Sequence, residues 1–250
     1  MQLAERVHLV GSGSFGFGLT DAYDCHIYLL DGGSELGLVD VGAGMGAAQV
    51  VENVRRAGFD PGAIGQIVCT HAHGDHAGGA ARMRALLPSA TLALSSYAAD
   101  LIRRGDEAGT SIGVARTAGV YPSDYKLEPC PVERELAEGD ELAIGDLVLE
   151  CIATPGHADG HLSLLLDYDG TRSLFAGDLV FHGGTILLQN THDCRLEELA
   201  ASLRKLRGLG LDALLPGHFT PSLRDGQRHI ERANEVLDQL LIPPQAVSAW

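Results

Sequence analysis

Hydrophobic and polar positions along the chain form short apolar runs that alternate with amphipathic stretches. The apolar runs predict strands near residues 6–10, 25–30, 36–41, 66–70, 91–94, 141–144, 147–153, 162–167, 172–177 and 213–215. Apolar residues at helical spacing predict helices at 45–57, 77–87, 96–104, 196–207 and 224–241. Because strands and helices alternate in both halves, the pattern indicates an α/β protein.

Metal-type side chains are concentrated directly after the apolar run at 66–70. The sequence Thr-His-Ala-His-Gly-Asp-His runs from Thr70 to His76 and holds three imidazoles and one carboxylate. Histidine is the commonest metal ligand, and an aspartate completes a nitrogen and oxygen set suited to zinc, iron or manganese. A polar turn with solvated histidines does not require this density, so we interpret the segment as a metal-binding loop.

Three further candidate ligands stand where later apolar runs end. His157 closes a Thr-Pro-Gly-His turn after residues 147–153, Asp178 follows Gly177, and His218 follows Gly217. Strands that end at one edge of a sheet aim such side chains into a single cleft. Each motif is weak alone, but the four motifs together predict one composite site.

These motifs, in this order, resemble the metallo-β-lactamase-fold hydrolase superfamily, glyoxalase II among its members, over residues 7–218. The resemblance implies a four-layer αββα sandwich of two mixed β-sheets flanked by helices. We expect one domain over residues 1–250, with a helical insertion near 95–135 that caps the cleft. The insertion carries Tyr97, Tyr121 and Tyr125, which either meet substrate or are ordinary core and surface residues.

The same resemblance implies two divalent metal ions, with zinc favoured and iron or manganese as alternatives. One ion would be held by His71, His73 and His157, the other by Asp75, His76 and His218, with Asp178 bridging both. Asp40 would support the metal-binding loop by a hydrogen bond to a ligand imidazole. His161, in Pro-Gly-His-x-x-Gly-His, corresponds to a supporting residue and not to a ligand.

The implied activity is hydrolysis of a small acyl substrate. Two ions about 3.5–4 Å apart can share a hydroxide, because coordination lowers the pKa of water to about 7. Asp75 and Asp178 are the candidate catalytic carboxylates. A thioester is favoured because a thiolate leaves with little help from a general acid, and a lactone or phosphodiester is the alternative. Only 32 residues follow His218, so we do not expect the glutathione-binding helical domain of glyoxalase II.

Two other classes of function stay open at this point. The metal-binding loop also resembles that of mononuclear iron persulfide dioxygenases, in which His71, His73 and either Asp178 or His157 would bind one iron. A binding protein that retains the metal site without turnover is the third class, and it would keep its effect after Asp178→Asn.

Composition and charge indicate which classes of partner and which cellular location to expect. The net charge of −15 argues against nucleic acid, which requires clustered Lys and Arg. No run of eighteen apolar residues is present and Met1 to Val10 lacks a signal-peptide core, so we expect a cytoplasmic protein that does not cross a membrane. The five cysteines form no Cys-x-x-Cys pair and are expected to be reduced, with Cys69 and Cys151 in the core. The oligomeric state is left open, a homodimer included.

Two glycine-rich segments resemble nucleotide-binding loops but lack their context. Residues 11–16 read Gly-x-Gly-x-x-Gly without a following helix, and residues 42–47 are explained by Asp40 and the metal-binding loop. Residues 11–24 are interpreted as a mobile hairpin loop in which Phe15 or Phe17 either contacts substrate or is an ordinary turn residue. His26 is expected to be a core histidine, and His182 is a weaker candidate for substrate contact.

Overall fold

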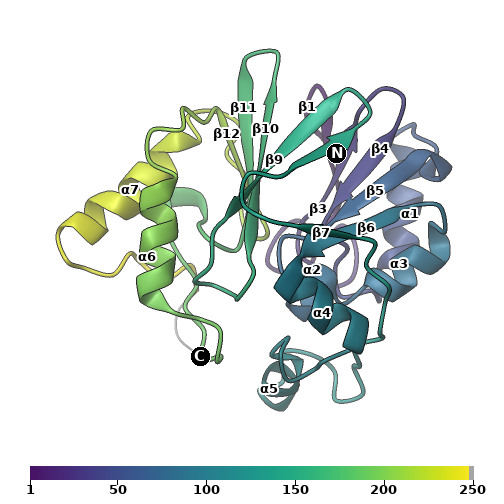
Figure 1. Ribbon diagram of the computed structural model, residues 1–250, viewed down its shortest axis with the longest axis horizontal. Coiled ribbons are helices and arrows are strands. Elements are labelled where there is room, and N and C mark those ends of the chain that lie inside the picture. The colour runs from purple at the N-terminus through teal and green to yellow at the C-terminus, as the bar shows by residue number, and fades with distance from the viewer. Residues whose placement is uncertain (248–250) are drawn as a thin grey trace. The chain divides into compact units, whose positions relative to one another are not determined.

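A computed structural model describes residues 1–247 of the chain (Figure 1). The chain forms two compact units, the first made of residues 1–136 and 143–147 and the second of residues 137–142 and those from 148 onward. The prediction of one domain over 1–250, of which the last three residues lie outside the described range, stays a prediction.

The first unit is built on a seven-stranded mixed sheet. Its strands lie in chain order: β1 (Gln2–Ala4), β2 (Val7–Gly11), β3 (Ile27–Asp31), β4 (Leu36–Val39), β5 (Ile64–Val68), β6 (Thr91–Ser95) and β7 (Arg134–Leu136). Pairing is antiparallel from β1 to β4 and parallel from β4 to β7. The carboxyl ends of β4, β5 and β6 therefore meet at one edge of the sheet.

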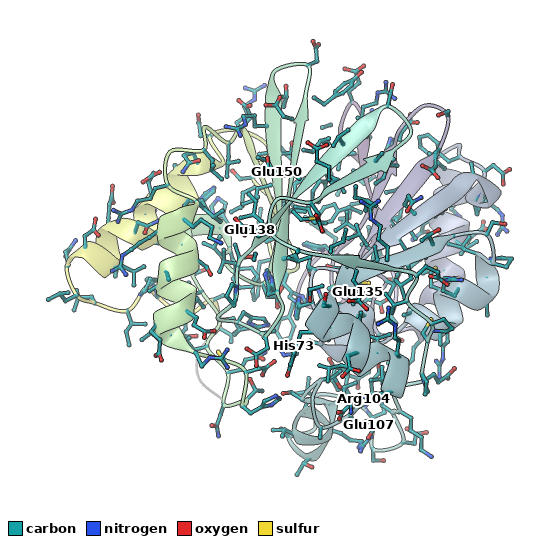
Figure 2. All side chains as sticks on the ribbon, in the orientation of Figure 1. His73, Arg104, Glu107, Glu135, Glu138 and Glu150 are labelled. Carbon is teal, nitrogen blue, oxygen red and sulfur yellow. The ribbon has the colours of Figure 1, made fainter. Side chains whose placement is uncertain are left out.

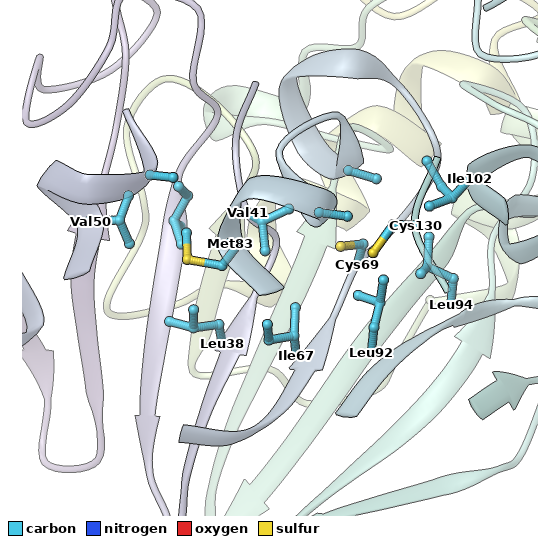
Figure 3. Packing of buried hydrophobic residues seen from close by; sticks show 14 of the residues in the cluster. Leu38, Val41, Val50, Ile67, Cys69, Met83, Leu92, Leu94, Ile102 and Cys130 are labelled. Atoms are coloured by element: carbon cyan, nitrogen blue, oxygen red, sulfur yellow. The ribbon is translucent and has the colours of Figure 1, made fainter. Parts of the chain in front are cut away.

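The helices of the first unit are α1 (Ala47–Arg56), the 3₁₀ turn η1 (Pro61–Ala63), α2 (Gly74–Ala77), α3 (Ala80–Leu86), α4 (Ser96–Arg104) and α5 (Ile112–Thr117). Of these, α1 and α4 contact strands of this sheet. In α1 the buried residues Val50, Val51 and Val54 share one side of the helix. Figure 3 shows Val50 and Met83 of the helices packed over Leu38 and Ile67 of the strands, in one continuous core.

The second unit is built on a five-stranded mixed sheet in the order β12–β11–β10–β9–β8. Its elements are β8 (Glu141–Ile144), β9 (Leu147–Ala153), β10 (Leu162–Tyr168), β11 (Thr171–Gly177), η2 (His182–Gly184), α6 (Leu196–Lys205), β12 (Ala213–Pro216) and α7 (Gln227–Asp238). β10 pairs antiparallel with β9 and β11, and β11 pairs parallel with β12. As a result β9, β11 and β12 run in the same direction. Leu203 of α6 and Ile230 of α7 are fully buried in the core of this unit.

The secondary structure agrees with the sequence predictions except at short or glycine-interrupted elements. The predicted helix at 77–87 corresponds to the shorter helix α3, whereas α2 lies almost wholly before it, and Gly78 and Gly79 separate the two helices. The edge strands β1 and β7 and the helix α5 were not predicted, since three to six residues carry too little periodicity. Helices α4 and α5 lie within the expected insertion at 95–135. Within residues 1–247, the structure contains no helix with the length and apolarity needed to span a membrane.

Candidate metal centre

In the first unit the metal-binding loop begins where β5 ends, and Asp40 holds its first residue in place. Asp40 follows β4, which pairs in parallel with β5. The Asp40 Oδ1 accepts a hydrogen bond of 2.7 Å from the backbone N–H of Thr70, and the Thr70 hydroxyl donates to the same carboxylate. The Asp40 backbone has a φ of 61°, a left-handed conformation that aspartate adopts more readily than most residues.

Asp40 also orients two of the candidate ligand imidazoles. His76 Nδ1 lies 2.9 Å from Asp40 Oδ2, and because a carboxylate only accepts, we assign the His76 proton to Nδ1 and the ligand role to Nε2. The Thr70 hydroxyl, which donates to Asp40, is assigned as the acceptor from His71 Nδ1 at 3.0 Å, so Nε2 is also the atom of His71 that would bind a metal. Asp40 thus makes the hydrogen bonds expected of the predicted supporting residue, and the metal binding of these imidazoles stays a prediction.

The remaining residues of the loop gather around His71. Its ring centroid lies 4.7 Å from that of His73 and 4.1 Å from that of His76. Asp75 sits in the first turn of α2, with its Oδ2 3.8 Å from His76 Nε2. The first unit therefore brings together all four predicted ligands of the loop.

Two more side chains lie near this cluster: Tyr121, which the sequence left as either a substrate contact or a core residue, and Cys25, to which it gave no role. The Tyr121 hydroxyl donates a hydrogen bond of 3.0 Å to Asp75 Oδ1, and burial, followed by the charge of Asp75, raises the pKa of Tyr121 well above its usual range. Tyr121 therefore remains a neutral donor. The Cys25 sulfur lies within 4.8 Å of ligand-type atoms of Asp40 and His76, and burial raises the pKa of this thiol, so that Cys25 stays protonated.

In the second unit the three predicted ligands lie at one edge of the five-stranded sheet. His157 follows β9, Asp178 follows β11 and His218 follows β12, the three strands that run in the same direction. The Gly217 N–H donates to the carbonyl of Gly177 at 2.7 Å, which extends the β11–β12 pairing up to the two ligand positions. Parallel pairing thus explains why Asp178 and His218, 40 residues apart in sequence, are neighbours.

A single carboxylate oxygen of Asp178 faces both histidines. Asp178 Oδ2 lies 3.6 Å from His157 Nε2 and 3.4 Å from His218 Nε2. Two atoms that bind one ion at about 2.1 Å in tetrahedral geometry are separated by about 3.4 Å. The nitrogen and oxygen donors of the second unit therefore fit metal coordination, and so does the 3.8 Å pair of Asp75 and His76 in the first unit.

Supporting hydrogen bonds fix these side chains. His157 Nδ1 donates to the Leu187 carbonyl at 3.3 Å, which presents Nε2 as the ligand atom. His161 Nε2 accepts from the backbone N–H of Asp178 at 3.2 Å, and its Nδ1 contacts the Thr154 hydroxyl at 2.9 Å. These contacts agree with the prediction that His161 supports the site without being a ligand.

The other histidine and cysteine predictions are largely confirmed. His26 is buried with its Nδ1 3.0 Å from the Ser12 hydroxyl, as expected for a core histidine. Cys69 and Cys151 are buried free thiols. His182 is exposed and packs against His229, with ring centroids 4.5 Å apart. Its contact with substrate stays a prediction.

The loop at residues 11–24 has the paired ends of a hairpin. The Gly13 N–H donates to the Asp24 carbonyl at 2.9 Å, and the Ser14 N–H donates to the Ala22 carbonyl at 2.9 Å. Phe15 and Phe17 on this loop are exposed, and the Phe17 ring stacks on His26 at 5.6 Å. Their contact with substrate also stays a prediction.

Three relatives with assigned functions resemble the chain. The atrochrysone carboxyl ACP thioesterase of Aspergillus fumigatus is 27% identical over 76% of this chain and 49% of its own length. The acyl-coenzyme A thioesterase MBLAC2 of Gallus gallus is 33% identical over 75% of this chain and 70% of its own. A hydroxyacylglutathione hydrolase of Rhodopseudomonas palustris is 31% identical over 61% of this chain and 47% of its own. The chain thus spans about half the length of the first of these relatives.

A solved structure and a family model establish the fold and the family. A metallo-beta-lactamase from Cronobacter sakazakii superposes with a TM-score of 0.72 and 22% identity, covering 96% of each chain, which confirms the predicted metallo-β-lactamase fold. The sequence model of the metallo-beta-lactamase superfamily matches residues 20–218, a range that contains the metal-binding loop and all the later candidate ligands. This match agrees with the fold and with the candidate ligands at the strand ends. The chain therefore belongs to the metallo-beta-lactamase superfamily.

Proposed function

We propose that the chain is a dinuclear metal-dependent hydrolase, with zinc as the favoured metal, that cleaves thioesters of small acyl groups. In this proposal the ligand groups of the two units form one centre. The first ion is held by His71, His73 and His157, the second by Asp75, His76 and His218, and Asp178 contacts both.

The arrangement around Asp178 is the observation that supports this proposal most strongly. Its Oδ2 lies at ligand-type separation from His157 and from His218, which come from two different strand ends. A bridging carboxylate has to face one histidine of each ion at the same time. His157 and Asp178 are also almost fully buried, a position in which ionisable groups are rarely found unless they are paired or bind metal.

The chain supplies the orientation of the ligand side chains, and the ions would supply Lewis acidity and a lowered pKa for water. Asp40 holds His76 and, through Thr70, His71 in the tautomer that presents Nε2. The Leu187 carbonyl does the same for His157. These contacts keep the imidazole rings aligned, so that little reorganisation accompanies metal binding.

Thioesters are favoured by the leaving group and by the relatives. Hydrolysis breaks the carbon–sulfur bond, joins the acyl carbon to a water oxygen, and releases a carboxylic acid and a thiol. A thiol has a pKa of about 8.5, so the thiolate departs without a strong general acid. The relatives named above are an ACP thioesterase, an acyl-coenzyme A thioesterase and a hydroxyacylglutathione hydrolase.

Thiol release by the zinc-loaded protein tests the proposal. The substrates are S-lactoylglutathione and a short-chain acyl-coenzyme A, followed with a thiol-reactive dye, and the metal content of each sample is measured. We expect release by the wild type and a loss of about a hundred- to a thousandfold in Asp178→Asn, because removal of one key electrostatic group costs about 10²–10³ in rate. Asp212→Asn is the matched control, since Asp212 is an exposed carboxylate at the opposite end of β12.

Each alternative gives a different result in the same assay. Hydrolysis of a lactone or phosphodiester without thiol release would replace the thioester in the proposal. Protein that purifies with one iron and consumes oxygen with a persulfide would replace the hydrolase with a dioxygenase. Full activity in Asp178→Asn would refute the metal mechanism.

A further inference from the structure

The segment between α4 and β7 places one side chain on the metal-binding loop. Tyr121, buried at 7% exposure, donates its hydroxyl hydrogen bond to Asp75 Oδ1 at 3.0 Å across 46 positions of sequence. The other oxygen of the same carboxylate, Oδ2, lies 3.8 Å from His76 Nε2. One carboxylate oxygen of Asp75 thus faces the Tyr121 phenol, and the other faces His76.

A second tyrosine fixes the backbone of the same loop. The Tyr125 ring stacks on Tyr121 with centroids 4.8 Å apart, and its hydroxyl lies within hydrogen-bond distance of the carbonyls of Gly74, at 3.2 Å, and Ala43, at 3.0 Å. The glycines of the loop make room for the pair. A Cβ at Gly74 would lie 3.0 Å from the Tyr121 hydroxyl, and one at Gly78 would lie 2.1 Å from the Tyr125 hydroxyl.

An ion pair stabilises the segment that carries both rings. Arg116 of α5 forms a salt bridge of 2.8 Å with Glu107 and donates to the Tyr125 carbonyl at 2.5 Å. Glu107 also accepts from the Leu127 N–H at 3.2 Å. Figure 2 labels Glu107 on the segment that leads from α4 to α5. Tyr121 is therefore positioned by its stacking on Tyr125, which this segment holds in place, as well as by its hydrogen bond to Asp75.

We propose that Tyr121 is a positioning residue that holds the Asp75 carboxylate with Oδ2 directed to the second metal ion. The inference rests on the proposed dinuclear centre. The Asp75 side chain is 24% exposed, so close packing alone does not fix its carboxylate, and the hydrogen bond from the phenol adds a directed contact. Without that hydrogen bond, the Asp75 carboxylate would lose rotational freedom when the ion binds, at a cost in affinity. With the hydrogen bond, that rotation is already restricted before the ion binds.

The expected effect is confined to one of the two ions. Loss of an outer hydrogen-bond partner of a metal ligand weakens metal binding by roughly 10- to 100-fold. Tyr121→Phe removes the hydroxyl and keeps the ring that stacks on Tyr125. We therefore expect a dissociation constant about tenfold higher for the ion at Asp75 and His76, and an unchanged constant for the ion at His71 and His73.

Stepwise metal binding measures this difference directly. The metal-free wild type and variants are titrated with Zn²⁺ against a chromophoric chelator, and Co²⁺ titrations report the coordination of each site through visible absorption. Tyr125→Phe is the matched control, because it removes an equally buried hydroxyl from the same ring pair that contacts backbone carbonyls only. Because the loop at Gly74 carries predicted ligands of both ions, this variant should lower the unfolding midpoint and affect both ions alike, leaving the ratio of the two affinities as in the wild type.

The outcomes separate the inference from the proposed function. The role of Tyr121 is supported if the wild type binds two ions and only Tyr121→Phe weakens the second ion relative to the first and alters the cobalt absorption of that site. This holds even if no thioester is cleaved. Equal affinities in wild type and Tyr121→Phe overturn the inference while the hydrolase stands. An equal change of the ratio of the two affinities in Tyr125→Phe also overturns the inference, since the effect would then come from the loop as a whole. A wild type that binds one ion refutes both.

Discussion

The support that Asp40 gives to His76 can be tested with a single-atom change. Asp40→Asn replaces one carboxylate oxygen with an amide group, and asparagine tolerates the left-handed backbone, at a φ of 61°, as well as aspartate does. One amide oxygen can still accept from the Thr70 N–H at 2.7 Å. The NH₂ group then faces His76 Nδ1 at 2.9 Å, donor against donor.

The magnitude follows from that contact. To avoid the clash of donors, His76 has to move its proton from Nδ1 to Nε2, which is the atom that would bind metal. A hydrogen bond to a charged acceptor contributes about 1.5–3 kcal/mol, and 1.4 kcal/mol corresponds to a factor of ten in affinity. We therefore expect the ion held by His76 to bind about 10- to 100-fold more weakly in Asp40→Asn.

The assay is zinc titration of the metal-free protein against a chromophoric chelator, with thermal unfolding recorded in parallel. Asp24→Asn is the control, because Asp24 is an equally buried carboxylate that accepts from the Ala43 N–H at 2.8 Å and touches no predicted ligand. Both variants should be less stable, but only Asp40→Asn should bind zinc more weakly. Wild-type affinity in Asp40→Asn, or equal weakening in Asp24→Asn, would refute the reasoning.

Two further predictions concern stability. Gly78→Ala places a Cβ 2.1 Å from the Tyr125 hydroxyl, so urea unfolding should show a free energy of unfolding lower by about 1–3 kcal/mol. Gly113→Ala lies at an open helical site in α5 and should raise the free energy of unfolding by up to about 1 kcal/mol. Equal effects of the two variants would contradict this packing. Burial above all lowers the pKa of His229 to about 4, so its ring is neutral when it accepts from the Gly183 N–H at 2.9 Å. The unfolded chain, with an ordinary histidine pKa near 6.5, takes up this proton first, and stability should fall as the pH drops from about 6.5 to 4. The slope should be smaller in His229→Gln, and an unchanged slope would show that other groups cause it.

The local pattern of the sequence was enough to predict most elements and the candidate ligands. Strands β9, β10 and β11 match their predicted ranges to within a residue, because seven consecutive residues give a clear signal. The ligands were predictable for the same reason. His157, Asp178 and His218 each stand within four residues of the end of a strand, and strands that run in the same direction bring their carboxyl ends to one edge.

Tertiary structure decided the contacts that fix those ligands. Nothing local to Tyr121 indicates that its hydroxyl meets Asp75, and the notable position of Asp40 did not reveal which imidazole it would hold. The short elements β1, β7 and α5 exist because neighbouring strands and side chains complete their hydrogen bonds and buried faces, not because of their own propensity. The sequence pattern indicates which side chains are suited to a buried position or to metal binding. It does not show that His76 meets Asp40, 36 positions away, or that Tyr121 meets Asp75, 46 positions away. These contacts depend on distances that are set only when the chain folds.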